Sequence, residues 1–210
     1  MTLNDLVFVQ KLIANRLLLP PVLELGAGYG GSTCREIVQA AELEYKTTDL
    51  HAGPGVDFIA DFEDNACIEH FPGTFGSVLV LNVLEHAFEP IKVLNNAVDL
   101  CVSGGTIVTI TPCVWPVHNF PRDCQRLLPD WYLIFAERNK QVRLLDDGFE
   151  FLGYGPIASF ARGGELHLPP SSRNEIHDIY SRIAHKLLRT SGRGKWTANH
   201  VAIGAVFQKL

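Results

Sequence analysis

The sequence predicts an α/β fold in which a doubly wound, mainly parallel sheet of seven strands is covered by helices on both faces. Three observations support this class. Short apolar runs alternate with amphipathic stretches, a tight glycine turn follows the first run, and a last apolar run lies at 200–210. Strands that alternate with helices form buried parallel sheets. The 210 residues are enough for one such domain and short for two.

The individual elements follow from apolar residues that recur at helical spacing or run on continuously. The predicted strands cover residues 21–25, 43–49, 56–60, 77–82, 105–111, 149–155 and 200–210. The predicted helices lie within 1–18 and at about 32–41, 91–101, 130–140 and 176–187. Thr33 and Glu36 have the spacing of a capping box for the second helix, and Gly104 and Gly105 are expected to close the third. Only residues 50–55 separate the second and third predicted strands. Because parallel crossovers usually need a dozen residues or more, the third strand is expected to be short or irregular.

Composition and charge argue against several classes of protein. The net charge of −5 gives no overall positive field to attract nucleic acid. No apolar run is long enough to span a bilayer, and the N-terminal segment lacks the cleavage site of a signal peptide. A cytoplasmic protein with no membrane or nucleic acid partner is therefore expected. The five cysteines form no CxxC pair or cluster with histidines, so reduced thiols and no metal site are expected.

The strongest functional signal is the glycine-rich segment ELGAGYGG at 24–31, placed between a predicted strand and a predicted helix. Gly26, Gly28 and Gly30 remove side chains where a ligand approaches the backbone, and a helix start offers free N–H groups. The pattern leaves two cofactors open. Three of its glycines also satisfy the dinucleotide fingerprint G-x-G-x-x-G, and Asp49 lies near the distance expected for the ribose-binding acid of that motif.

Glu24, at the end of the buried first strand, favours a cationic ligand. A buried carboxylate costs free energy unless it meets a cation or several donors. A dinucleotide pyrophosphate is anionic, whereas S-adenosylmethionine carries a sulfonium and an ammonium against one carboxylate. Asp49, Asp61 and Glu85 would add to an acidic lining. At an effective dielectric near 20, unit charges about 4 Å apart interact by roughly 4 kcal/mol, which biases the choice strongly. The alternative is that Glu24 only caps the following turn.

With these residues the chain resembles the class I S-adenosylmethionine-dependent methyltransferases, most closely the small type 11 group, over about residues 20–160. The similarity rests on five segments in order: VLELGAGYG, the acid of TTD, Asp61-Phe62 after VDFIA, NVLEHAFEP and SGGTIVTITP. It implies a Rossmann-like fold with an antiparallel C-terminal strand at 200–210. A single domain is expected, with an N-terminal helix at 1–18, a cofactor-binding core at 20–160, and a lid or insertion helix at 161–198.

The resemblance also implies roles for particular residues. The implied cofactor-binding residues are Glu24, Gly26, Ala27, Gly28, Gly30, Asp49, Leu50, Asp61, Phe62, Asn82, Val83 and Leu84. Asp49 would bind the ribose hydroxyls, and Asp61 with Phe62 would hold the adenine. The methionine part would lie against Glu24 and the glycines, and the residues after the fourth strand would approach it.

The predicted acceptor site lies in the long loop that follows the fifth strand. The expected substrate-binding residues are Trp115, Phe120, Asp123 and Arg126. His118 is the first candidate for a catalytic base and His86 the second. Other interpretations stay open: the aromatic residues pin the loop to the core, Asp123 and Arg126 form a local ion pair, and His86 is a helix-start residue bonded to backbone.

The predicted reaction is in-line transfer of the methyl group of S-adenosylmethionine to an oxygen or nitrogen of a small polar acceptor, with S-adenosylhomocysteine as product. The sulfonium already carries a good leaving group, so alignment is the main requirement and a base is optional. An NAD(P)-dependent oxidoreductase and a non-catalytic binding module are the alternative functions. A homodimer is a further possible assembly.

Overall fold

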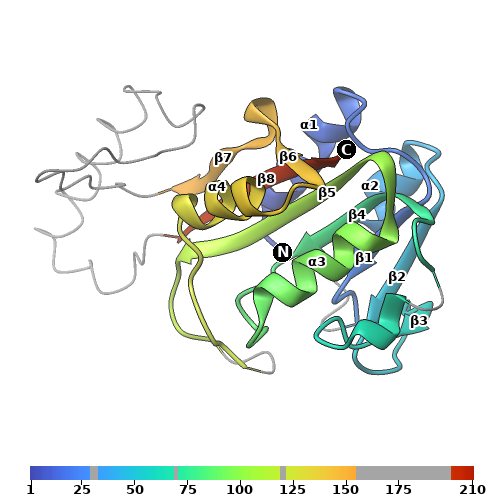
Figure 1. The fold of residues 1–210 in the computed structure, drawn as a ribbon, viewed down its shortest axis with the longest axis horizontal. Coiled ribbons are helices and arrows are strands. Elements are labelled where there is room, and N and C mark those ends of the chain that lie inside the picture. Colours follow the sequence, from blue (N-terminus) through green and yellow to red (C-terminus); the bar gives the residue numbers. More distant parts are fainter. Residues whose placement is uncertain (29–32, 69–70, 119–121, 155–199) are drawn as a thin grey trace, which may run out of the picture.

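Eight strands of the described residues pair into one mixed sheet at the centre of the computed structural model (Figure 1), which describes residues 1–28, 33–68, 71–118, 122–154 and 200–210. The strands are β1 Val22–Leu25, β2 Tyr45–Asp49, β3 Phe58–Ile59, β4 Phe75–Leu81, β5 Cys101–Val114, β6 Val142–Leu144, β7 Glu150–Tyr154 and β8 His200–Lys209. The helices are α1 Leu3–Ala14, α2 Arg35–Ala40, α3 Pro90–Leu100 and α4 Pro129–Arg138, with short 3-10 helices η1 Asn65–Ile68 and η2 Asp146–Gly148.

The strand order is β3-β2-β1-β4-β5-β8-β6, and β7 also pairs with β8. Strands β1 to β5 pair in parallel, whereas β8 runs antiparallel to β5, β6 and β7. This confirms the predicted mainly parallel sheet with an antiparallel terminal strand. The carboxyl ends of β1, β2 and β4 therefore meet at one edge of the sheet, which is where open α/β sheets bind their ligands.

Apolar side chains cover both faces of the sheet, as the doubly wound class requires. All seven residues of β4 are buried. One face packs against α3 and α4, and the other packs against α1 and α2. On the α1 side, the ring of Phe8 lies directly over Gly204 of β8, where an added Cβ would be 2.7 Å from the ring. The bare backbone of this glycine therefore lets α1 lie close to the sheet.

Some predicted elements are confirmed and others are wrong. The third strand, β3, has only two residues, as its brief connection implied. Among the described residues the sheet has eight strands and not the predicted seven, because the three-residue β6 is too short to give a sequence pattern. Gly104 and Gly105 do not close a helix, since α3 ends at Leu100 and β5 begins at the next residue.

The predicted capping box of α2 is also wrong. This helix begins at Arg35 with Cys34 as its N-cap residue, and the N-cap side chain makes no capping hydrogen bond. The backbone N–H of Cys34 donates to the carboxylate of Glu24 at 2.9 Å. Thr33 Oγ1 accepts the N–H of Arg35 at 3.3 Å, so Thr33 and a carboxylate from β1 both contact the helix start, without the predicted pairing of Thr33 with Glu36.

Some expectations lie outside the described residues, namely the helix around 176–187, the lid or insertion at 161–198, Gly30 and Phe120. Within the described ranges, the helices are all too short or too polar to cross a bilayer.

Candidate functional site

The glycine loop after β1 is joined to the end of β2 through Asp49. The backbone N–H of Gly28 donates to Asp49 Oδ2 at 2.9 Å, and the N–H of His51 donates to Oδ1 at 3.1 Å. An added Cβ on Gly28 would lie 2.9 Å from Asp49 Cγ. A carboxylate has about four acceptor positions, so these two contacts leave capacity for ligand hydroxyls. The sequence prediction that Gly28 and Asp49 share one site is consistent with this geometry.

Glu24 is buried, and it supports the start of α2. Its Oε2 accepts hydrogen bonds from the Tyr45 hydroxyl at 2.5 Å and from the Cys34 N–H at 2.9 Å. Burial is the main cause that raises the pKa of Glu24 above its ordinary value, and the two donors oppose that rise. This arrangement matches the alternative in which Glu24 caps the following turn. Contact between Glu24 and a cofactor stays a prediction.

The loop after β4 presses against the glycine loop. Asn82 adopts a left-handed backbone conformation with φ of 54°, which is uncommon for a residue with a side chain. Gly26 has φ of 72°, and an added Cβ there would lie 2.8 Å from Val83 Cγ2. Leu84 is fully buried in the core, and its carbonyl oxygen accepts a hydrogen bond from the Gln125 side chain at 3.3 Å, so contact between Leu84 and a cofactor stays a prediction.

Sequence reasoning missed Asp5, a buried carboxylate that α1 brings to the end of β4. The Nδ2 of Asn82 donates to Asp5 Oδ2 at 3.3 Å, and only 2% of Asp5 is exposed. The signal was present in the sequence, because Thr2 and Asp5 form a capping box. The N–H of Thr2 donates to Asp5 Oδ2 at 2.7 Å, and the N–H of Asp5 donates to Thr2 Oγ1 at 3.3 Å.

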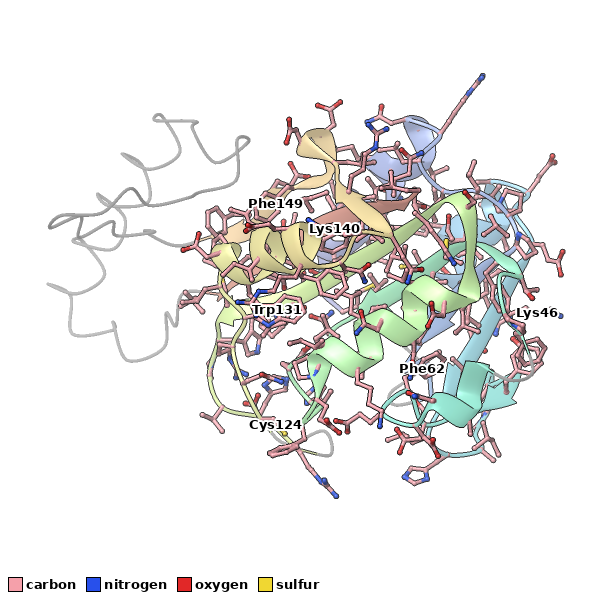
Figure 2. The ribbon with its side chains drawn as sticks, viewed as in Figure 1. Lys46, Phe62, Cys124, Trp131, Lys140 and Phe149 are labelled. Atoms are coloured by element: carbon pink, nitrogen blue, oxygen red, sulfur yellow. The ribbon has the colours of Figure 1, made fainter. Side chains whose placement is uncertain are left out.

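A pocket of about 250 Å³ lies beside β3, and both residues predicted to hold adenine line it. Asp61 is exposed, whereas Phe62 is buried against the core on the side of the sheet covered by α3 (Figure 2). Thr48 lines the same pocket, and its buried Oγ1 has no hydrogen-bond partner among the described residues. Leu50, also predicted to contact the cofactor, is half exposed. The glycine loop and Asp49 lie outside this pocket's lining.

Backbone contacts fix the loop after β5 against the loop after β4. The N–H groups of Cys124 and Gln125 both donate to the carbonyl oxygen of Glu85, at 2.8 and 3.2 Å. The side-chain amide of Gln125 also donates to the carbonyl of Ala87 at 2.7 Å. These contacts bring His118 to His86 across a long stretch of sequence, and the two ring centroids are 5.0 Å apart.

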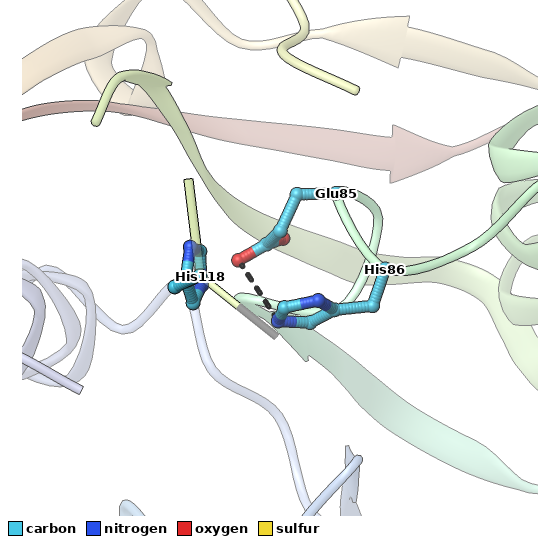
Figure 3. Close-up of side chains that lie close together, drawn as sticks. All are labelled: Glu85, His86 and His118. Carbon is cyan, nitrogen blue, oxygen red and sulfur yellow. Dashed lines mark ion pairs between the residues drawn. The ribbon is translucent and has the colours of Figure 1, made fainter. Parts of the chain in front are cut away.

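Glu85, His86 and His118 form a side-chain cluster at this junction (Figure 3). His86 Nε2 lies 3.7 Å from Glu85 Oε1, and His86 Nδ1 bonds to the carbonyl of Arg122. Burial raises the pKa of Glu85 to about 8 and lowers the pKa of His86 below its ordinary value. A neutral imidazole at physiological pH can accept a proton or bind a metal ion.

Asp123 and Arg126 form the local ion pair that the sequence analysis gave as an alternative to acceptor binding. Arg126 Nη2 donates to Asp123 Oδ2 at 2.6 Å, Nη1 bonds to Oδ1, and the Asp123 side chain is almost fully buried. The guanidinium holds the pKa of Asp123 below its usual range. Asp123 Oδ2 also accepts the backbone N–H of His118 at 2.7 Å. The pair thus positions the His118 segment. Acceptor contacts by Asp123, Arg126 and the half-buried Trp115 stay predictions.

No protein-family model and no curated protein sequence matches this chain. Solved structures do. A SAM-dependent methyltransferase from Archaeoglobus fulgidus is 14% identical, with a TM-score of 0.56 over 99% of this chain and 94% of that one. The MccD protein is 12% identical, with a TM-score of 0.56 over 97% and 96%. The cyclase SpnF is 13% identical, with a TM-score of 0.54 over 96% and 81%.

At these identities the likeness shows the fold alone. The described sheet has the Rossmann-like architecture of the methyltransferases, with mostly parallel strands and antiparallel strands toward the C-terminus. One of the three similar structures is named for a cyclisation, so the fold does not determine the reaction. Function must therefore be inferred from the residues of the site.

Proposed function

We propose that this chain is an S-adenosylmethionine-dependent methyltransferase that methylates an oxygen or nitrogen of a small polar acceptor. The observation that carries the proposal is the contact between the Gly28 backbone and the Asp49 carboxylate at the ends of β1 and β2. Bare backbone beside a carboxylate suits a nucleoside, whose ribose hydroxyls donate to the acid while its chain lies along the glycine turn.

The charges around this edge favour a cationic cofactor. Asp49 lies at the glycine loop, and the buried carboxyl groups of Asp5 and Glu24 lie on neighbouring elements. The ionised carboxylates among these groups attract the sulfonium and ammonium of S-adenosylmethionine and repel a pyrophosphate, and the raised pKa of Glu24 lessens its own share of this attraction. The antiparallel insertion of β8 between β5 and β6 also supports a methyltransferase over an NAD(P)-dependent oxidoreductase. The pocket at Asp61 and Phe62 offers an apolar space for the adenine.

Methyl transfer needs mainly alignment, because the sulfonium carries its own leaving group. Holding donor and acceptor in line lowers a barrier by about 7 to 11 kcal/mol. If the acceptor is a hydroxyl, His118 is the first candidate to take its proton and His86 the second. Replacing His118 by alanine is then expected to reduce turnover by about 10²- to 10⁴-fold while affinity for S-adenosylhomocysteine stays normal.

Isothermal titration tests the cofactor directly. S-adenosylmethionine and S-adenosylhomocysteine are each expected to bind one per chain, and NADH is expected to give no heat. Binding of NADH alone would support the oxidoreductase. Folded protein that binds none of the three would support a non-catalytic module. A thermal-shift screen of small metabolites in the presence of S-adenosylhomocysteine then searches for the acceptor.

A further inference from the structure

Glu85 lacks the partners that a buried carboxylate needs. Its side chain is fully buried, and neither carboxylate oxygen has a hydrogen-bond partner within the described part of the chain. The 3.7 Å between Glu85 Oε1 and His86 Nε2 is longer than a hydrogen bond. Burial of an unpaired carboxylate is costly, and native proteins relieve that cost with donors or with a cation. Protonation also relieves this cost, and a cation bound beside Glu85 would favour its charged form instead.

Two imidazoles meet this carboxylate. Glu85, His86 and His118 each offer one ligand atom, and these atoms lie within 4.8 Å of one another. Figure 3 shows the carboxylate of Glu85 close to both rings. Two histidines and one carboxylate are a recurrent ligand set for catalytic Zn²⁺ and for non-haem Fe²⁺, and this set leaves coordination positions open for substrate or water.

The outer contacts of both rings also have the form found at metal sites. His86 Nδ1 bonds to the Arg122 carbonyl, and His118 Nδ1 lies 3.3 Å from Asp123 Oδ2. A metal-bound histidine normally donates its other ring N–H to a carbonyl or carboxylate, which fixes the tautomer and the ring orientation. In both rings these contacts are made by Nδ1, which is the arrangement in which Nε2 binds a metal ion. The Arg126 guanidinium in turn holds Asp123 in place.

We propose that Glu85, His86 and His118 bind one divalent first-row transition metal ion, of which Zn²⁺ is the type case. The carboxylate of Glu85 and the Nε2 atom of each imidazole supply three ligands. Tetrahedral ligand atoms about 2.1 Å from Zn²⁺ lie about 3.4 Å from one another. The three atoms here lie within 4.8 Å of one another, so each pair would have to come closer by at most about 1.4 Å. Side-chain movement alone can close a gap of this size.

An open position on this ion can hold an oxygen of the acceptor. The ligands directly follow Asn82, Val83 and Leu84, which are the residues expected at the methionine end of the cofactor. A hydroxyl bound to the ion would be more acidic and would lose its proton to solvent water, so the step would not need a histidine base. This acceptor role rests on the proposed methyl transfer, whereas metal binding itself does not. The expectation of no metal from the sequence is replaced by this proposal.

Titration with Co²⁺ tests the site, because Co²⁺ takes the same ligands and absorbs visible light when bound by imidazole and carboxylate. The chelator-treated full chain is expected to bind one Co²⁺, with bands that one equivalent of Zn²⁺ removes. His118→Ala and Glu85→Gln are each expected to weaken Co²⁺ binding by about 10-fold or more. His51→Ala removes an exposed histidine elsewhere and serves as the control, with binding unchanged.

Two results would overturn the inference. One is wild-type protein that stays colourless with Co²⁺ although circular dichroism shows it folded. The other is equal Co²⁺ affinity in wild-type, His118→Ala and Glu85→Gln proteins. Calorimetry with S-adenosylhomocysteine on the same samples separates the two proposals. Protein that binds S-adenosylhomocysteine but not Co²⁺ would overturn the metal-site proposal alone. Protein that binds Co²⁺ but not S-adenosylhomocysteine would overturn the methyltransferase proposal alone.

Discussion

Asp49, at the carboxyl end of β2, accepts the backbone N–H of Gly28 at 2.9 Å and so ties the glycine loop to the neighbouring strand. A side chain at Gly28 would collide with Asp49, since an added Cβ would lie 2.9 Å from Asp49 Cγ. The acid and the bare backbone therefore act as one unit. A change at either residue alters the shape and the charge of the same ligand surface.

Gly28→Ala is expected to weaken S-adenosylhomocysteine binding by more than about 10-fold while the protein stays folded, because the new methyl group pushes Asp49 from its place. Calorimetry and a melting curve measure the two effects. Gly53→Ala is the matched control, since its new Cβ would meet only Val56 Cγ2 at 3.9 Å, an ordinary contact. Equal affinities in the two variants would show that the cofactor does not use this surface.

Asp49→Asn tests the charge and not the shape. Hydrogen bonds to a charged group contribute about 1.5 to 3 kcal/mol, so losing the charge should weaken S-adenosylhomocysteine binding by roughly 10- to 150-fold. Asp147→Asn, an exposed acid in η2, gives the same change in net charge away from the site. The idea fails if Asp49→Asn binds the ligand as tightly as Asp147→Asn does.

The close approach of α1 to the sheet gives a packing prediction. Gly204→Ala would place a methyl group 2.7 Å from the Phe8 ring, and such overpacking costs about 1 to 3 kcal/mol of unfolding free energy. Phe8→Leu in the same chain should recover part of that loss, because the smaller side chain makes room. Urea denaturation of the single and double variants measures both terms. Additive losses in the double variant would contradict direct packing of these two residues.

Local patterns were enough to predict the main fold. The apolar run before the glycine segment gave β1, and the last apolar run gave β8, whose antiparallel pairing is confirmed. The three-residue β6 was missed, because Val142–Leu144 is too short for a period to be seen. The capping box at Thr33 was wrong because α2 has Cys34 as its N-cap residue, and Glu24, from another element, accepts the N–H of Cys34. Sequence spacing cannot show such a competing tertiary contact.

The candidate site was likewise predicted from the sequence only in part. Gly28 and Asp49 were predicted together because Asp49 lies near the distance expected for the ribose-binding acid of the glycine motif and because the family resemblance pairs them. The structure brings them into contact. The grouping of His118 with Glu85 could not be predicted, because it depends on backbone hydrogen bonds that fold the loop after β5 back onto the loop after β4. Asp5 was missed because it lies in α1, outside the region of family resemblance.

Glu24 should make stability depend on pH. Burial raises its folded-state pKa above the ordinary 4.5, so the folded chain keeps this proton in a range where the unfolded chain has lost it. The contribution of Glu24 is therefore fully present below about pH 4.5 and is lost as the pH rises through the raised value. Glu24→Gln keeps an acceptor for Cys34 and Tyr45 but cannot ionise. The unfolding free energy of this variant should therefore rise relative to that of the wild type as the pH rises. Urea denaturation at several pH values from 4.5 upward measures this difference.

Glu36→Gln, which changes an exposed glutamate on α2, should follow the wild-type curve. Parallel curves for wild type and Glu24→Gln would mean that Glu24 ionises in the folded protein as easily as in the unfolded chain.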